Sequence, residues 1–192
     1  QSELLELQSR LKKTIIFITH DINEAFKLGD RVAVMRGGSI VQIGAPEEIL
    51  NNPSDEYIED FVKDIDRTKV VQAKDIMQRA NALVSIKDGV RVAIKEMQAN
   101  SISSVFVIDK DRVLQGIVTI DDCIQAAREG KSLKEILKHD YYTTKKDVYI
   151  QHLIDKGVET RYPIVVIDEE NKVLGIIVRT SILSGLLGKN RD

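Results

Sequence analysis

The sequence predicts an α/β (α+β) fold in which a short first part is followed by two copies of one small unit. A run of β-branched and aromatic residues, residues 14–19, ends abruptly at His20 and gives way to a helical pattern, which indicates a buried strand. Beyond residue 73 the chain repeats itself, because residues 105–109 are answered by residues 164–168, a shift of 59 positions (164 minus 105). Each copy carries two apolar runs between helical stripes, so we expect helix, strand, turn, strand and helix in that order.

Composition excludes several classes of protein. Among 192 residues, 28 are basic and 30 are acidic, so the chain has no overall charge that favours nucleic acid. No apolar run reaches the ~18 residues of a membrane span, and the amino terminus shows no signal-peptide pattern. Cys123 falls in an apolar helical stripe, which suits a core position in a reducing compartment. We therefore expect a soluble cytoplasmic chain, and we predict no metal site.

Residues 1–62 form the first part. We expect a helix over residues 2–12, then the strand that ends at His20, and further elements around residues 29–35 and 42–50. These segments resemble the end of the ATP-binding subunit of ABC transporters. In that family the histidine matching His20 is the switch residue that contacts the γ-phosphate of ATP, so the resemblance implies that catalytic role in an intact parent subunit. The alternative is a structural histidine, hydrogen-bonded at the end of a strand.

The phosphate loop that ATP requires is not found in this sequence. Residues 130–132 read Gly-Lys-Ser, but the first glycine of such a loop belongs at position 125, where the chain has Gln125. The acidic metal-binding strand and the signature loop of ABC proteins are also unmatched before Thr14. We therefore expect a truncated end of an ABC ATPase domain that hydrolyses no ATP by itself and has no cofactor, since ATP and magnesium belong to the intact parent.

A boundary follows near residue 63. An apolar helical stripe ends in the charged residues 64–69, which indicates a closing helix and then a linker over residues 63–73. The two copies are predicted over residues 74–130 and 131–192. Turn-rich links at residues 109–112 and 168–171 separate their strands. A unit of about 60 residues makes only a marginal core, so we expect the copies to bury their faces together.

The paired copies resemble tandem cystathionine-β-synthase (CBS) domains, also called a Bateman module. The resemblance rests on the apolar-apolar-Asp turns that end at Asp109 and Asp168, and on the Gly-apolar-apolar sequences that begin at Gly116 and Gly175. An ABC tail followed by such a pair resembles the ATP-binding subunit of osmoprotectant importers for glycine betaine, carnitine, choline and proline. That resemblance implies a homodimer joined through the CBS repeats, transmembrane permease subunits as partners, and a peripheral position on the inner face of the membrane.

A nucleotide site is predicted where a strand of the first copy meets the following helix. Free backbone N–H groups and the hydroxyl of Thr119 would receive a phosphate, and Asp122 would accept both hydroxyls of a ribose. The resemblance implies the same roles, because CBS domains that bind adenosine nucleotides have a threonine or serine and an aspartate at these two positions. The alternative is a helix cap made by Thr119 and Asp122.

The second copy has Val178 and Ser181 at the matching positions, so it lacks the carboxylate for a ribose. It offers Tyr162 for stacking on a base and Arg179 for a phosphate or a base edge. The predicted apolar walls are Ile164, Ile176 and Val178. Some importers of the family are held shut by cyclic di-AMP, which has no free 2′,3′-diol. We therefore predict cyclic di-AMP as the ligand, with AMP or ATP as alternatives. The alternative is that these residues form no ligand site. Tyr162 would then pack against a loop, and Arg179 would be a solvated charge at the start of a helix.

A basic stretch around the start of the second copy has two interpretations. Related transporters sense ionic strength through cationic CBS surfaces on anionic lipid, an attraction that salt screens within ~8 Å at 0.15 M. Acidic residues interleave here, so we prefer a solvated face of mixed charge. The basic residues are Arg128, Lys131, Lys134, Lys138, Lys145 and Lys146. Nucleotide sensing is thus the favoured function, and ionic-strength sensing or structural dimerisation without a small ligand are the alternatives.

Overall fold

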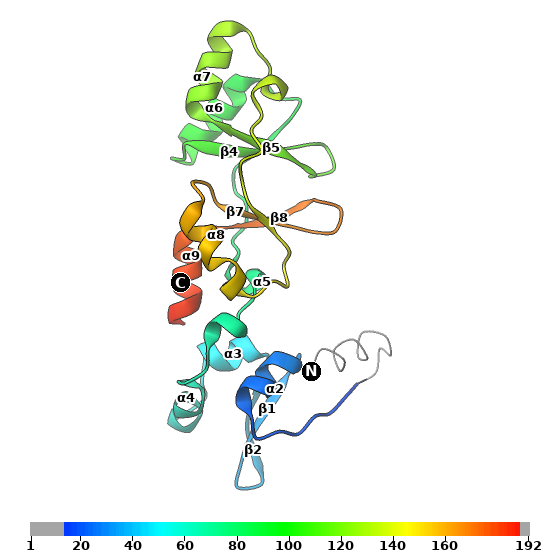
Figure 1. Ribbon diagram of the computed structural model, residues 1–192, viewed down its shortest axis with the longest axis vertical. Coiled ribbons are helices and arrows are strands. Elements are labelled where there is room, and N and C mark those ends of the chain that lie inside the picture. The colour runs from blue at the N-terminus through cyan, green and yellow to red at the C-terminus, as the bar shows by residue number, and fades with distance from the viewer. Residues whose placement is uncertain (1–13, 189–192) are drawn as a thin grey trace.

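The computed structural model describes residues 14–188. They form three units stacked along one long axis: an N-terminal unit (residues 14–62) at one end, the second repeat in the middle and the first repeat at the other end (Figure 1). The α/β fold with two paired repeats is therefore confirmed. The helix expected over residues 2–12 lies outside the described residues.

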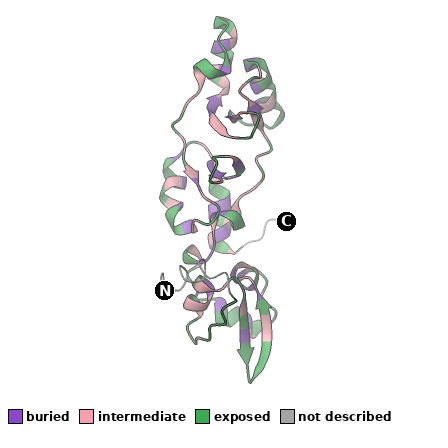
Figure 2. Cartoon of the chain, turned by 90° about the vertical axis from the view of Figure 1, so that its right-hand side faces the viewer, coloured by how far each residue is buried: buried purple, intermediate pink, exposed green. Residues whose placement is uncertain are grey.

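The N-terminal unit is a β-hairpin flanked by helices. Strands β1 and β2 pair in antiparallel register, and the side chain of Asp21 caps the first helix by accepting hydrogen bonds from the backbone N–H groups of Asn23 and Glu24. Much of the hairpin surface is exposed (Figure 2). The elements are α2 (Ile22–Leu28), β1 (Val32–Arg36), β2 (Ser39–Gly44), α3 (Pro46–Asn51) and α4 (Glu56–Val62).

The buried strand predicted over residues 14–19 does not form. These residues have no regular secondary structure, and Ile16 and Ile18 are 87% and 91% exposed. A lone extended segment leaves its backbone donors and acceptors unpaired, and β1 and β2 pair only with each other among the described residues. His20, at the end of this segment, is exposed rather than held at the edge of a sheet.

Each repeat is a three-stranded sheet with two helices against one face. The central strand pairs antiparallel with the strand that follows it, as predicted, and also parallel with a short strand that the sequence pattern missed, β3 or β6. The first repeat contains β3 (Leu83–Ser85), α6 (Val90–Ala99), β4 (Ser104–Ile108), β5 (Leu114–Thr119) and α7 (Ile120–Glu129). The second contains β6 (Thr143–Thr144), η3 (Ile150–His152), α8 (Ile154–Glu159), β7 (Ile164–Ile167), β8 (Val173–Ile177) and α9 (Arg179–Leu187). Short helices lie before each repeat: η1 (Arg67–Lys69), α5 (Ala73–Ile76) and η2 (Leu133–Ile136).

The two repeats exchange the segments that lead into them. Gln78, which leads into the first repeat, bridges to Ile176 of β8, and Lys138, which leads into the second, bridges to Ile117 of β5. The repeated glycine makes this exchange possible. A Cβ atom on Gly175 would lie 2.7 Å from the carbonyl oxygen of Gln78, and one on Gly116 would lie 3.0 Å from that of Lys138. Only glycine lets the crossing segment approach so closely.

Alternate residues of the central strands face different cores. In β4, Val105 and Val107 pack under α6 and α7, while Phe106 packs between the repeats. In β7, Ile164 and Val166 join a core that runs through the helices of the second repeat into the N-terminal unit. The sheets of the two repeats therefore face each other across a shared apolar layer, whose buried members are Phe106, Ile117, Val165, Ile167 and Val173.

Cys123 is fully buried in the core of the first repeat, as its apolar stripe predicts. Burial, together with the nearby charge of Asp122, raises the pKa of its thiol to about 11. Because the reactive form is the thiolate, we expect the native chain to react with Ellman's reagent at pH 8 about a hundredfold more slowly than the unfolded chain. Glu169→Cys, which adds a thiol on an exposed turn, should supply one fast-reacting group per chain. Rapid labelling of native Cys123 would contradict this burial.

Candidate functional site

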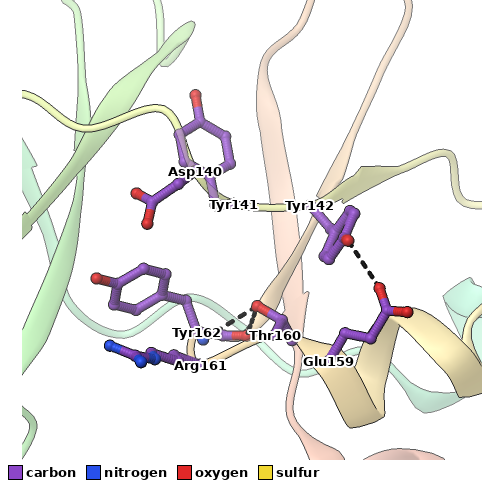
Figure 3. A pocket seen from close by; sticks show the side chains of 7 residues that line it. All are labelled: Asp140, Tyr141, Tyr142, Glu159, Thr160, Arg161 and Tyr162. Carbon is purple, nitrogen blue, oxygen red and sulfur yellow. Dashed lines mark hydrogen bonds between the residues drawn. The ribbon is translucent and has the colours of Figure 1, made fainter.

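A cavity of about 380 Å³ opens beside the sheet of the second repeat. Its walls come from two stretches of chain, the segment that leads into β6 and the loop between α8 and β7. Asp140, Tyr141 and Tyr162 lie on one side, whereas Tyr142 points to the other, toward Glu159 (Figure 3). The volume is near the lower end of the ~300–1,000 Å³ typical of small-molecule sites. The lining residues are Asp140, Tyr141, Tyr142, Glu159, Thr160, Arg161 and Tyr162.

The aromatic side of the cavity is anchored in the layer between the repeats. Tyr141 and Tyr162 both pack against that layer, and the ring of Tyr141 meets the ring of Phe106 edge to face, with centroids 5.7 Å apart. Burial raises the pKa of Tyr141, so its hydroxyl, which is protonated at neutral pH in any case, keeps its proton to a higher pH than usual. Two rings held in this way offer flat apolar surfaces with polar ends, which suits an aromatic base.

The loop that carries Tyr162 is fixed by Thr160 and Arg179. The Thr160 hydroxyl accepts a hydrogen bond from the N–H of Tyr162 (3.1 Å) and donates one to its carbonyl oxygen (3.0 Å). Arg179 donates from Nε to the carbonyl oxygen of Gly157 (2.9 Å) and from Nη2 to those of Val158 (3.0 Å) and Thr160 (2.6 Å). Arg179 thus closes the end of α8 and holds the cavity wall. A direct contact from Arg179 to phosphate stays a prediction.

The three predicted apolar walls differ in position. Ile164 is 1% exposed and packs in the core beneath α8 and α9, so in this structure it is not a wall of the cavity. Ile176 is partly buried and packs on the layer that holds Tyr141 and Tyr162. Val178 immediately precedes α9 and is also partly buried. Of the predicted residues of the second repeat, Tyr162 lines the cavity. Ile176 packs on the layer behind it, Arg179 fixes the loop that carries Tyr162, and Ile164 is turned away.

Thr119 and Asp122 form a cap on α7, and a third residue joins them. The Thr119 hydroxyl accepts from the N–H of Asp122 (3.3 Å) and donates to its Oδ2 (2.5 Å). The Lys138 ammonium lies 2.6 Å from the same oxygen. Burial would raise the pKa of Asp122, but the hydrogen bonds from Lys138 and Thr119 outweigh it, so the pKa is lowered. The pKa of Lys138 is raised, chiefly by its hydrogen bond to Asp122.

The second repeat lacks this ion pair. Ser181 stands where Asp122 stands in the first repeat, and Gln78 bridges its sheet where Lys138 bridges the first. The Ser181 hydroxyl is buried and has no hydrogen-bond partner among residues 14–188. The missing ribose carboxylate is thus replaced by a small neutral group.

Sequence patterns alone missed Lys138, Tyr141 and Arg161 as site residues. Lys138 was one of a basic stretch, and the only signal for its role is its place 60 residues after Gln78 (138 minus 78), the residue that makes the matching bridge. Other members of the stretch support the mixed-charge interpretation, since Lys131 pairs with Glu129 at 2.6 Å. Within residues 14–188, no cluster of three or more potential metal ligands occurs, and no helix has the length and hydropathy of a membrane span.

Comparison with known proteins identifies the family of the two repeats. The family model "CBS domain" matches residues 73–129 and 133–188, so the chain belongs to the CBS domain family.

The sequence of the chain is also similar to ATP-binding subunits of transporters. The glycine betaine transport ATP-binding protein OpuAA of Bacillus subtilis (strain 168) is 44% identical over 190 residues, which are 99% of this chain and 45% of that protein. The glycine betaine/carnitine transport ATP-binding protein GbuA of Listeria monocytogenes is 45% identical over 189 residues, 98% of this chain and 47% of that protein. The chain thus spans about half the length of these curated relatives.

Solved structures share the fold of the paired repeats. Staphylococcus aureus OpuCA matches with a TM-score of 0.52 at 22% identity, over 57% of this chain and 93% of that one. CBSX2 in complex with AMP matches with 0.54 at 20% identity, over 62% and 98%. CbpB in complex with c-di-AMP matches with 0.55 at 19% identity, over 62% and 86%.

Proposed function

We propose that this chain is the regulatory region of the ATPase subunit of a compatible-solute importer, and that it senses cyclic di-AMP. The relatives named above are ATP-binding proteins for transport of glycine betaine and carnitine, and the chain matches them along nearly its whole length. In this proposal the intact subunit lies in the cytoplasm and binds the permease subunits of the transporter at the membrane. The region itself hydrolyses no ATP and controls the subunit through a bound adenine nucleotide.

We base the choice of ligand on the cavity and the sequence of the second repeat. The cavity presents Tyr141 and Tyr162 for an adenine and the exposed Arg161 for a phosphate. Solved structures with this fold hold AMP in one case and cyclic di-AMP in another, so the fold accommodates adenine nucleotides. The second repeat has Ser181 where the first repeat has Asp122, and the lack of a ribose carboxylate at that position favours a ligand without a free diol.

The size of the cavity supports binding at a two-fold axis. About 380 Å³ suits one nucleotide half, and a cyclic dinucleotide must place its second half elsewhere. Two chains related by two-fold symmetry would offer two such cavities to one ligand. Linkage then requires the ligand to strengthen the dimer by the same factor as dimerisation strengthens ligand binding.

Replacing Tyr162 with alanine should weaken cyclic di-AMP binding roughly 5- to 150-fold, because stacking on a base is worth ~1–3 kcal/mol. Isothermal titration calorimetry of the whole chain with cyclic di-AMP, AMP and ATP measures this, and we expect one cyclic di-AMP for two chains. Tyr162→Phe should retain most of the affinity, since the ring remains. Tyr57→Ala, in the N-terminal unit, is the control and should bind normally. AMP binding that depends on Asp122, with no cyclic di-AMP binding, would overturn the proposal.

A further inference from the structure

We propose that Lys138 closes the Thr119–Asp122 position of the first repeat against nucleotides with a free 2′,3′-diol, and so confines regulation to the cavity of the second repeat. This inference deepens the proposed function and rests on it for the identity of the regulated cavity. It makes Lys138 a specificity-determining residue that acts by occupying the Asp122 carboxylate, which would otherwise accept the hydroxyls of a ribose.

The geometry of the closure is specific. The Oδ2 atom of Asp122 receives the Thr119 hydroxyl at 2.5 Å and the Lys138 ammonium at 2.6 Å, so both neighbours converge on one carboxylate oxygen. A ribose diol needs that carboxylate as a paired acceptor. It would have to displace an ammonium, which is the stronger partner because it carries a full charge.

Lys138 is held in place by the backbone, not by its side chain alone. Its carbonyl oxygen accepts from the N–H of Ile117 (3.0 Å), and its N–H donates to the carbonyl oxygen of Ile117 (2.9 Å). Ile117 lies two residues before Thr119 on β5. The backbone pairing of Lys138 with Ile117 therefore places Lys138 beside the cap of α7. Asp140, two residues further along, already lines the second-repeat cavity. One short segment thus blocks one nucleotide position and builds the other.

The internal repeat offers a comparison within the same chain. At the matching place in the second repeat, Gln78 and Ser181 replace Lys138 and Asp122, and no ion pair forms between them. The closure is therefore not a consequence of the fold, which forms the same bridge with a neutral side chain. It depends on the charge at position 138.

The opposite role for Lys138 makes a different prediction. An ammonium near the amino end of α7 could instead bind the phosphate of an incoming nucleotide, in which case its removal would weaken binding. Closure predicts that removal strengthens binding. The two roles differ in sign, so one substitution separates them.

The test is calorimetry of the full chain with AMP. Lys138→Met should bind AMP about two- to fivefold more tightly than the unsubstituted chain, a modest gain because the Lys138 side chain is 42% exposed and partly solvated ion pairs are weak. The double variant Lys138→Met with Asp122→Asn should lose that gain. Lys131→Met removes a lysine that also lies 2.6 Å from a carboxylate, that of Glu129, and is the matched control, with AMP affinity unchanged.

Three results would overturn the inference: AMP affinity that falls in Lys138→Met, affinity that stays within twofold, or a gain that survives in the double variant. Cyclic di-AMP, titrated in parallel, separates this inference from the proposed function. If the unsubstituted chain binds cyclic di-AMP and Lys138→Met gains no AMP binding, closure fails while the function stands. If cyclic di-AMP does not bind but the AMP gain appears, closure stands and the ligand assignment fails.

Discussion

Replacing Arg67 with methionine is expected to lower the free energy of unfolding by about 2–4 kcal/mol, because its guanidinium joins the N-terminal unit to the second repeat. Arg67 donates from Nε to the carbonyl oxygen of Gly185 on α9 (3.0 Å), from Nη1 to that of Leu50 on α3 (3.2 Å), and from Nη2 to the side chain of Asn51. Burial lowers the pKa of Arg67, but the group remains charged at neutral pH. Methionine keeps the apolar stem and removes all three donors.

Urea unfolding measures the effect of Arg67→Met. The control is Arg91→Met, an exposed arginine on α6, for which we expect a change within ~0.5 kcal/mol. A second readout is amide exchange, in which α3 and α9 should lose protection while β4 and β5 keep theirs. Equal stability of Arg67→Met and Arg91→Met would show that the junction is held by apolar contacts alone, through the core that the two units share.

The strands of the two repeats that the sequence predicted correctly are those with a local signature. A β-hairpin is defined by two apolar runs and a turn between them, and both Asp109 and Asp168 make such turns by accepting hydrogen bonds from the N–H groups that follow. The short parallel strands β3 and β6 carry no such signature, because two or three residues are too few for a periodic pattern. The segments that cross between the repeats could not be predicted either, because a local pattern of apolar residues carries no information on pairing between residues far apart in the sequence.

The candidate cavity could be anticipated from the sequence only in part, for similar reasons. Tyr162 follows from the position of an aromatic residue before a strand, and the structure does place it in a cavity wall. Ile164 illustrates the limit: every residue of β7 is apolar and buried, so the sequence cannot tell which face turns toward the cavity. The prediction of a buried strand before His20 was wrong, because such a strand needs neighbouring strands that residues 14–62 do not supply.

Replacing Phe106 with alanine is expected to lower the free energy of unfolding by about 3–5 kcal/mol and also to weaken the proposed binding of cyclic di-AMP. Phe106 is 4% exposed at the centre of the layer between the repeats, and its ring meets Tyr141 of the cavity. The substitution leaves a void beside the ring of Tyr141, where the Phe106 ring was. Because Tyr141 then loses the ring that orients it, we expect cyclic di-AMP affinity to fall although Phe106 does not line the cavity.

The control for Phe106 is Phe61→Ala, the same change at a residue that is 39% exposed and stacked on Tyr57 in the N-terminal unit. It should cost about 1 kcal/mol, since little apolar surface leaves a packed core, and it should leave ligand binding intact. Phe106→Leu preserves most of the volume and should cost less than ~1.5 kcal/mol, yet it still removes the edge-to-face contact with Tyr141. Reduced cyclic di-AMP affinity in this stable variant would show that the layer between the repeats orients the binding surface, whereas full affinity would show that Tyr141 holds its position without Phe106.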